Sequence, residues 1–479
     1  MKLLDKLKNY SQKDIIPFHM PGHKRKSLCP DLPYNIDITE IDGFDNLQNP
    51  NGILKDCLDK ASKVFGSYKT FFSVNGGTCG CLSALATYCD IGDKIIIATN
   101  CHKSIYNFIE LFNLKAIYVA PKYDKFGIAK SFCATDFEKV VDNNLDAKAV
   151  VITSPTYEGV ISDIKGIAQF LHSKNIPLIV DEAHGTHLVF ESKSALNYAD
   201  IVLNSCHKTL PSLTQTALVH VGNNALNKEF VAKLLQDKIN KFQSSSPSYI
   251  LMASIDECVE FVKKNGGKEY KKFVNNLGKF EKKSKELKCI KIINYNEPCD
   301  YFDFDKSKIL LMCPFMNGKK LMNELRKKGF ELEMSYNNYC LAMTTIMDDK
   351  SIFDKFFEAL LLIDNEISLK NIKKSKKTMS QNENFEKDTN VCKFSFDRSF
   401  PLTIHDVTKQ KGEYLDIYNA IGKISKEYIY AYPPGSPVLI PGEKITKQFV
   451  EMFDNMKNNG TEFGSTSGEL KNNKISIVK

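Results

Sequence analysis

The sequence has no long uninterrupted apolar segment, and it has no tryptophan. A membrane-spanning helix needs about 20 mostly apolar residues in succession, and no run in these 479 residues approaches that length. Paired Cys-x-x-Cys spacing is missing among the 14 cysteines, and the first residues do not read as a secretory signal. We therefore expect no membrane span, and we expect a reduced cytoplasmic protein without structural disulfides.

A strong charge of one sign is lacking as well. The 65 Lys and Arg residues exceed the 57 Asp and Glu residues by only 8, and the excess is scattered, so nucleic-acid binding is not predicted. No metal site is expected, because His184-x-x-His187 and Cys79-Gly-Cys81 have no further ligand cluster nearby in the sequence. The length predicts two or three domains, and a hydrophobic content of 43% is enough for sizeable cores.

Two polar segments each follow a short apolar run. Val180-Asp-Glu-Ala-His184 continues the run Pro177–Val180, and Lys208 follows the run Ile201–Leu203. Such β-branched runs are typical of buried parallel strands, and ligands bind at the carboxyl ends of these strands. We therefore expect Asp181 and Lys208 to face one crevice, where they would suit the ring nitrogen and the carbonyl of pyridoxal 5'-phosphate (PLP). The alternative is a helix-capping aspartate and a surface lysine.

A glycine-rich turn indicates a phosphate site. Asn75–Gly80 follows the strand-like run Thr70–Val74 and precedes the helix-like stretch Cys81–Ala86. A turn of this kind, at the start of a helix, presents backbone N–H groups and the positive end of the helix dipole to a phosphate. Thr78 can add a hydroxyl. By itself the pattern also fits a turn that binds nothing.

Two further strand-like runs lead into polar clusters. Lys94–Ala98 is followed by Asn100-Cys-His-Lys-Ser104, and Ala147–Ile152 leads into Ser154–Gly159. His102 could stack on the ring of an aromatic cofactor, or it could be a histidine that is satisfied within a loop. Several strand-end clusters in one doubly wound pattern favour a shared site more strongly than any single cluster does.

The sequence resembles the bacterial Orn/Lys/Arg decarboxylases. The segments that resemble signatures of this family occur in the family's order: Pro17–Lys24, Thr39–Asp45, Asn100–Ser104, Pro155–Val160, Val180–Gly185, Ser205–Pro211, Ser244–Tyr249 and Ala431–Glu443. The resemblance spans nearly the whole chain. It implies PLP as the cofactor and the decarboxylation of a basic amino acid to an amine and CO2, an activity of the kind used in polyamine biosynthesis.

Three departures from the family pattern concern the cofactor site. Cys79 stands where the family has a serine in the phosphate turn, Ser244 and Ser245 replace threonines, and Cys206 replaces a small hydroxyl residue. A thiol donates only a weak hydrogen bond. We expect these changes to tune cofactor affinity, because none removes a group that the chemistry needs.

The resemblance implies an α/β fold of type I, similar to aspartate aminotransferase, with a mostly parallel large-domain sheet. The implied organisation is an N-terminal arm (1–45) that packs against a partner subunit, a PLP-binding large domain (46–265), a small α/β domain (266–368), a polar linker (369–394) and a C-terminal α+β domain (395–479). The chain resembles the short form of the family, which is expected to have no extra N-terminal domain. In the small domain we predict strands over Lys306–Met312, Phe330–Tyr336 and Tyr339–Met347, and helices over Lys319–Lys328 and Ser351–Ile363.

The resemblance assigns roles to five residues. Lys208 would carry PLP covalently, Asp181 would keep the pyridine nitrogen protonated, and His102 would stack on the ring. His207 would either contact the phosphate or donate the proton that ends the reaction. His184 would lie near the ring edge or the substrate carboxylate, or would only hold local structure.

The phosphate group is expected to bind residues from two chains. Its ligands in one chain would be Gly76, Gly77, Thr78, Cys79 and Ser205. Ser244 and Ser245 resemble a position that reaches the phosphate of a neighbouring subunit. A homodimer or a higher even-numbered oligomer is therefore expected, and cofactor binding should strengthen it.

The identity of the substrate is less constrained. A substrate that ends in an ammonium or guanidinium group needs a carboxylate at the far end of the pocket. The candidates are Glu40, Asp42, Asp45 and Glu443, with a solvated or capping loop as the alternative for the first three. Arginine and lysine are the leading substrates and ornithine is a third. Another PLP reaction, by an aminotransferase or a different lyase, and a non-catalytic regulatory protein remain as alternatives.

Overall fold

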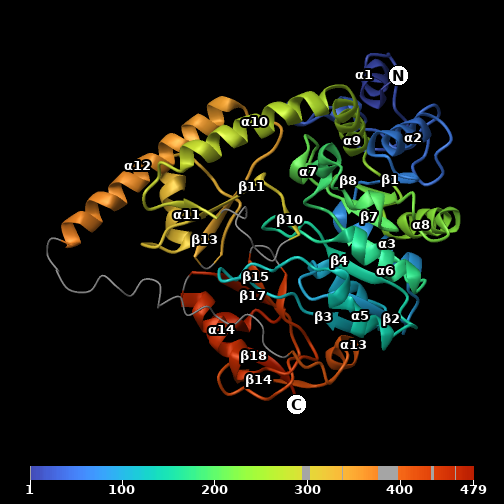
Figure 1. The fold of residues 1–479 in the computed structure, drawn as a ribbon. Coiled ribbons are helices and arrows are strands. Elements are labelled where there is room, and N and C mark those ends of the chain that lie inside the picture. Colours follow the sequence, from blue (N-terminus) through green and yellow to red (C-terminus); the bar gives the residue numbers. More distant parts are fainter. Residues whose placement is uncertain (1, 294–301, 337, 376–397, 433–435, 459) are drawn as a thin grey trace. The chain divides into compact units, whose positions relative to one another are not determined.

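The computed structural model describes residues 2–293, 302–336, 338–375, 398–432, 436–458 and 460–479. A seven-stranded sheet has the strand order β1-β8-β7-β6-β4-β2-β3 (Figure 1). Its strands are β1 (Lys69–Ser73), β2 (Lys94–Ala98), β3 (Lys115–Val119), β4 (Val150–Thr153), β6 (Leu178–Asp181), β7 (Ile201–Asn204) and β8 (Ala217–Val221). β4, β6 and β7 are parallel, whereas β8 is antiparallel to both β7 and β1.

The predicted α/β fold with a mostly parallel sheet is confirmed. Every residue of β6 and β7 is buried, as expected for apolar strands in the middle of a covered sheet. The strands predicted from the apolar runs coincide with β1, β2, β4, β6 and β7. The helix predicted after the glycine turn is α3 (Gly76–Tyr88).

The chain divides into two compact units. The first comprises Met1–Ile96, Cys133–Ser154 and Asp163–Tyr270, and the second comprises Ile97–Phe132, Pro155–Ser162 and Lys271–Lys479. The other helices of the first unit are α1 (Leu3–Ser11), α2 (Ile53–Phe65), α5 (Ala134–Asp142), α6 (Ile164–Ser173), α7 (Cys206–Thr209), α8 (Lys228–Phe242) and α9 (Tyr249–Phe261). Its short helical segments are η1 (Tyr34–Ile36), η2 (Thr186–Glu191), η3 (Ala195–Asn197) and the π-helical η4 (Val262–Gly266).

The N-terminal helix α1 packs against α9 of its own chain. The buried carboxylate of Asp256 on α9 accepts a hydrogen bond from the Leu3 N–H at 3.2 Å and pairs with Lys60 at 2.5 Å. Lys2 pairs with Glu257 at 2.7 Å. These contacts anchor the start of the arm within the protomer, and its expected packing against a partner subunit stays a prediction.

A four-stranded antiparallel sheet in the second unit has the order β12-β13-β11-β9. Its strands are β9 (Lys291–Ile292), β11 (Lys308–Met312), β12 (Met334–Tyr336) and β13 (Tyr339–Met343), and its helices are α11 (Gly318–Lys327) and α12 (Lys350–Ser375). The three strands and two helices predicted here are confirmed, but α12 continues 12 residues beyond the predicted Ile363. Residues 369–375 of the expected linker are thus helical, and residues 376–394 lie outside the described part of the chain.

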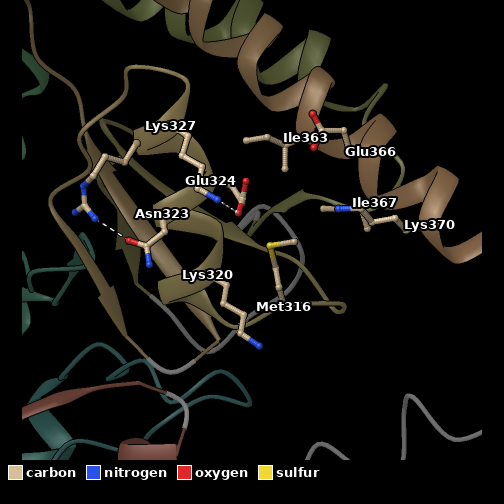
Figure 2. Close-up of a pocket in the computed structure, with 10 residues that line it drawn as sticks. Met316, Lys320, Asn323, Glu324, Lys327, Ile363, Glu366, Ile367 and Lys370 are labelled. Atoms are coloured by element: carbon tan, nitrogen blue, oxygen red, sulfur yellow. Dashed lines mark hydrogen bonds and ion pairs between the residues drawn. The ribbon is translucent and has the colours of Figure 1, made fainter.

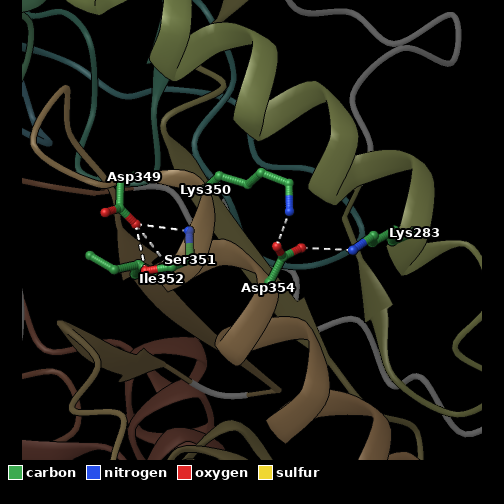
Figure 3. A network of polar contacts seen from close by, with 6 residues as sticks. All are labelled: Lys283, Asp349, Lys350, Ser351, Ile352 and Asp354. Atoms are coloured by element: carbon green, nitrogen blue, oxygen red, sulfur yellow. Dashed lines mark hydrogen bonds and ion pairs between the residues drawn. The ribbon is translucent and has the colours of Figure 1, made fainter.

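The first turn of α12 is held by acidic side chains. Asp349 Oδ1 accepts hydrogen bonds from the N–H groups of Ser351 at 2.8 Å and Ile352 at 3.1 Å (Figure 3). Asp354 then pairs with Lys283, at 2.7 Å, and with Lys350. Lys283 belongs to α10 (Gly267–Ser284), and these ammonium groups lower the pKa of Asp354 to about 2. The network joins α10 to α12.

The C-terminal part forms two small sheets, β14-β18 and β16-β15-β17. The elements from residue 398 onward are α13 (Ile404–Thr408), β14 (Gly412–Asp416), β15 (Ile429–Tyr432), β16 (Pro437–Leu439), α14 (Lys447–Asn458), β17 (Glu462–Ser465), η5 (Glu469–Asn472) and β18 (Lys474–Val478). α14 buries Phe449 and Phe453 in their shared core. The Pro433–Gly435 part of the signature lies outside the described residues.

The second unit also contains α4 (Lys103–Leu111) and a two-stranded pair, β5 (Val160–Ile161) with β10 (Asp303–Phe304). Among the described residues, no helix has both the length and the apolar character required to cross a membrane.

Candidate active site

Asp181 and Lys208 lie at the carboxyl ends of neighbouring strands. Asp181 ends β6, and Lys208 is on α7, the short helix that follows β7 directly. These strands are parallel, with Asp181 opposite Leu203. Asp181 is only 6% exposed, and its Oδ1 accepts a hydrogen bond from the Ala183 N–H at 3.1 Å. A buried carboxylate and a lysine therefore leave the same edge of the sheet.

One histidine contacts the lysine, and a second precedes it in the chain. His184 Nε2 lies 3.1 Å from Lys208 Nζ, so the imidazole can accept a hydrogen bond from the ammonium group. His207 Nδ1 lies 3.0 Å from the main-chain oxygen of Thr216, which acts as the acceptor. This bond makes Nδ1 the protonated ring nitrogen of a neutral His207 and leaves Nε2 as the atom that can exchange a proton.

The glycine turn lies against the start of the lysine segment. A Cβ atom at Gly77 would be 2.9 Å from Ser205 Oγ, so only glycine leaves room there for the hydroxyl. Gly76 has φ +75°, a conformation that glycine adopts without strain. The first turn of α3, with the exposed Thr78, and the Ser205 hydroxyl together form a cradle that suits a phosphate.

Two glutamines, which the sequence patterns did not identify, hold this turn. Gln215 Nε2 donates to the main-chain oxygen of Val74 at 2.8 Å, and the Gly76 N–H donates to the main-chain oxygen of Gln215 at 3.0 Å. Gln243 Oε1 accepts from the Val74 N–H at 2.8 Å. Glutamines with long-range partners have no local sequence signature, so no available pattern would have found them.

Cys79 is buried inside the first turn of α3. Its side chain is only 3% exposed, and burial raises the pKa of its thiol. A buried thiol that is held neutral in this way is a packed group. This position favours a structural role for Cys79, and its predicted contact with a phosphate stays untested.

Ser244 lies beside the glycine turn of its own chain. Its N–H donates to Asn75 Oδ1 at 3.1 Å, and its hydroxyl donates to the main-chain oxygen of Ser246 at 3.4 Å. Both Ser244 and Ser245 are exposed. The expected contact of these serines with the phosphate of a partner subunit stays a prediction.

His102 is the residue that precedes α4 in the second unit. Its Nδ1 lies 2.9 Å from the Ser104 hydroxyl and accepts a hydrogen bond from the Ser104 N–H at 3.3 Å. This is an N-terminal capping arrangement, which fixes the ring at the start of the helix. The predicted stacking of His102 on a cofactor ring stays a prediction.

Asp45 has a role in the backbone that sequence reasoning offered only as the alternative. Its carboxylate accepts N–H hydrogen bonds from Asn51 at 3.0 Å, Gly52 at 2.7 Å and Leu54 at 3.0 Å. Partial burial opposes its ionisation, but backbone donors outweigh burial and lower its pKa. Asp45 therefore organises the loop before α2, which favours capping over substrate binding. Glu40 and Asp42 are exposed.

Glu443 is the fourth predicted substrate carboxylate, and the structure gives it a different partner. Arg398 Nε and Nη2 each donate to a Glu443 oxygen at 2.6 Å, and the Ile440 N–H donates to Oε2 at 3.1 Å. The glutamate is fully buried. Because both oxygens are already engaged by a buried cation, this arrangement favours a structural ion pair, and the expected substrate role of Glu443 stays a prediction.

A pocket of about 550 Å³ lies between α11 and α12 (Figure 2). Its lining is charged on both sides: Met316, Lys320, Asn323, Glu324, Arg326, Lys327, Ile363, Glu366, Ile367 and Lys370. Lys327 pairs with Glu324 at 2.8 Å, and Arg326 donates to Asn323 at 2.7 Å. None of the predicted site residues lines it, so this pocket contributes nothing to the proposed chemistry.

Glu182, the residue after Asp181, is a further buried acid at the end of β6. It is 1% exposed and accepts hydrogen bonds from the Ala195 N–H at 2.7 Å, the Ser194 hydroxyl at 2.8 Å and Asn204 Nδ2 at 3.0 Å. Burial raises its pKa to about 7, although these three donors favour the ionised form. Its position within the Asp-Glu-Ala-His run was the signal that could have identified it.

This pKa predicts a pH dependence of stability. Between the ordinary value of 4.5 and about 7, the folded protein binds more protons at Glu182 than the unfolded chain does. The free energy of unfolding should therefore fall by about 3 kcal/mol as the pH rises through this range, relative to a Glu182→Gln variant that does not titrate. Denaturation followed by far-UV circular dichroism at a series of pH values measures the difference. Parallel pH curves for the two proteins would contradict it.

Solved structures of lysine decarboxylases share this fold. The Francisella novicida lysine decarboxylase aligns with a TM-score of 0.82 at 18% identity, covering 100% of this chain and 81% of that one. The constitutive lysine decarboxylase of Escherichia coli aligns with a TM-score of 0.80 at 17% identity, covering 100% and 82%. At such identities the likeness establishes the fold alone, and it confirms the predicted α/β fold of type I.

The chain belongs to the Orn/Lys/Arg decarboxylase family. The family's major domain matches residues 2–306, and its C-terminal domain matches residues 397–466. The arginine decarboxylases of Bacillus subtilis and Bacillus anthracis are each 29% identical to it; each alignment covers 94% of this chain, with 92% and 91% of the respective relative. The predicted family and the predicted enzyme class, an amino-acid decarboxylase, are confirmed.

Proposed function

We propose that this enzyme uses PLP, held by Lys208, to decarboxylate a basic amino acid, and that arginine is its substrate. The observation that carries the proposal is the Lys208–His184 pair beside the buried Asp181 at the carboxyl ends of adjacent parallel strands. The glycine cradle against Ser205 fits the phosphate group of the same cofactor. Similar arginine decarboxylases align over more than nine tenths of the chain, which favours arginine over lysine.

The residues divide the work by charge. When bound, PLP supplies a conjugated ring that takes up the electron pair left at the substrate Cα as CO2 departs. Asp181 keeps the proton on the ring nitrogen because a buried carboxylate favours a positive neighbour. Lys208 holds the cofactor through its amine, and His184 orients that amine. His207 Nε2 or the freed Lys208 amine returns the proton to Cα.

The positively charged end of the substrate needs a carboxylate that is not already engaged within the protein. Asp45 is engaged by backbone N–H groups and Glu443 by Arg398. Glu40 and Asp42, which are exposed, remain the candidates of the N-terminal loop. We propose that one of them contacts the guanidinium group, because a carboxylate can accept two parallel hydrogen bonds from it.

Product analysis and covalent labelling test the function together. Purified protein with PLP is incubated separately with arginine, lysine and ornithine, and CO2 and amine are measured. Agmatine and CO2 from arginine are expected, and borohydride reduction followed by peptide mapping should place a pyridoxyl group on Lys208. A keto acid in place of CO2 would mean an aminotransferase, and a label on another lysine would refute the assignment.

We also propose that the enzyme is a homodimer or a higher even-numbered oligomer in which Ser244 or Ser245 reaches the phosphate of the partner. If so, PLP tightens the assembly, because cofactor binding and association are thermodynamically linked. Sedimentation at low concentration should show a tighter dimer with PLP than without it. A Ser244→Ala/Ser245→Ala variant should lose the difference. Equal association of the apo and PLP-loaded proteins would show that the site lies within one chain.

A further inference from the structure

The chain segments that leave β6 and β7 are joined by successive side-chain contacts. Nearest the strands, Asn204 Nδ2 donates to the main-chain oxygen of Glu182 at 3.1 Å and to its Oε2 at 3.0 Å. Further along, the Thr186 hydroxyl donates to the main-chain oxygen of Ser205 at 3.2 Å. The contact between Lys208 Nζ and His184 Nε2 lies farthest along the two segments from the strands. The two segments therefore run side by side from the strand ends to the site.

Glu182 binds both the end of β7 and the connection that leads to it. Besides Asn204, the last residue of β7, it binds Ser194, the N-cap of η3, and Ala195, the first residue of η3. η3 belongs to the chain between β6 and β7. Because the carboxylate is buried, water does not compete for these hydrogen bonds. The carboxylate thus connects the end of β6 to two points on the path toward the lysine.

The alternation of an extended chain separates this anchor from the reacting groups. Asp181 lies opposite Leu203 in the register of β6 and β7, so these two side chains leave the sheet on the same side. Leu203 and Ser205 face Gly80 and Gly77 of α3, whereas Asn204, which stands between them in the chain, binds Glu182. The Glu182–Asn204 pair therefore lies on the side opposite to Asp181 and the Ser205 hydroxyl.

We propose that Glu182 is a positioning residue that acts through Asn204. It fixes the spacing between the end of β6, which carries Asp181, and the end of β7, which leads to Lys208. The inference rests on the proposed roles of Asp181 and Lys208. Packed apolar side chains would stabilise this region as well as a buried polar pair does. What the carboxylate adds is directed bonding that holds the two strand ends in one register.

The variant Glu182→Gln keeps the size of the side chain, but its amide N–H₂ must meet donors at either position: those of Ser194 and Asn204 at Oε2, or the Ala195 N–H at Oε1. We expect kcat to fall on the order of 10- to 100-fold, with KM changed by less than about threefold, because the loss is one of alignment. The pH titration of the visible absorbance of bound PLP should shift. In the apo protein, hydrogen exchange should become faster in the peptide 204–210.

A double variant that exchanges the carboxylate and the amide tests whether the hydrogen bond between residues 182 and 204 is what matters. In Glu182→Gln/Asn204→Asp an amide again faces a carboxylate, with donor and acceptor reversed. This double variant should regain about tenfold in kcat over the single Glu182→Gln variant if the tie between strand ends is what matters. Should Glu182→Gln fail to fold, Asn204→Ser removes the tie while keeping the glutamate, and the same three readouts apply.

Glu191→Gln is the matched control. Glu191 pairs with Lys193 at 2.7 Å and accepts a hydrogen bond from Tyr270, so its carboxylate is engaged away from both strand ends. The Glu191→Gln variant should leave kcat, the pH titration of the PLP absorbance and the hydrogen exchange of the peptide 204–210 unchanged. A Glu182→Gln protein with a lowered Tm but wild-type kcat, absorbance and exchange would overturn the inference. A wild-type protein without PLP on Lys208 would reject the proposed function instead, and exchange in the apo protein would still test the tie.

Discussion

Asp181→Asn is expected to lower kcat by several orders of magnitude, which corresponds to several kcal/mol of barrier, while the protein still binds PLP. Asparagine keeps the shape of the side chain but removes the negative charge that favours a protonated ring nitrogen. Asp181 is buried at the end of β6, so water does not screen the lost interaction. Steady-state turnover per bound PLP measures the effect.

A second buried aspartate, next to the other end of β7, provides the control. Asp200 precedes β7 at the amino ends of the strands, where it accepts N–H hydrogen bonds from Leu178 and Leu226, each at 2.7 Å, and pairs with His172 at 2.8 Å. Asp200→Asn should reduce stability while leaving kcat per folded protein close to wild type, because ligands bind at the opposite edge of such sheets. Near-normal turnover in Asp181→Asn would refute the role of Asp181 at the ring.

The strand-end residues could be predicted because burial of the central strands leaves a clear record in the sequence. The apolar runs that became β6 and β7 are short, β-branched and bounded by polar residues, and parallel strands expose their carboxyl ends at one edge. Asp181 and Lys208 follow directly from this rule. The 12 extra residues of α12 were missed because polar and charged side chains predominate after Ile363, and the apolar Ile367, Leu369 and Ile372 are few and widely spaced among them.

The acidic residues were harder to assign because a sequence shows a carboxylate but not its partner. Asp45 has its backbone donors within ten residues, and the capping alternative was therefore available. The partner of Glu443 is Arg398, 45 positions earlier. The donors of Glu182 come from η3 and β7, up to 22 positions later. Only the folded chain brings such groups together.

Glu443→Gln is expected to destabilise the protein by about 3–5 kcal/mol, because it leaves the Arg398 guanidinium buried without a counter-ion. The pair is shielded from water, with side-chain exposures of 12% for Arg398 and 1% for Glu443. Burial lowers the pKa of Arg398, but in the wild type Glu443 outweighs burial and raises it. In the variant the guanidinium still stays charged, because the intrinsic pKa of arginine is too high for burial to neutralise it. Because the chain lacks tryptophan, urea denaturation is best followed by far-UV circular dichroism.

A surface pair on the same part of the chain gives the comparison. Glu462 pairs with Lys319 at 2.9 Å, but its side chain is 76% exposed, so Glu462→Gln should cost no more than about 1 kcal/mol. Replacing both members of the buried pair, as in Arg398→Met/Glu443→Leu, should cost less than Glu443→Gln alone, since no buried charge is left unpaired. A Glu443→Gln protein of normal stability with a raised KM for arginine would instead restore Glu443 as a substrate ligand.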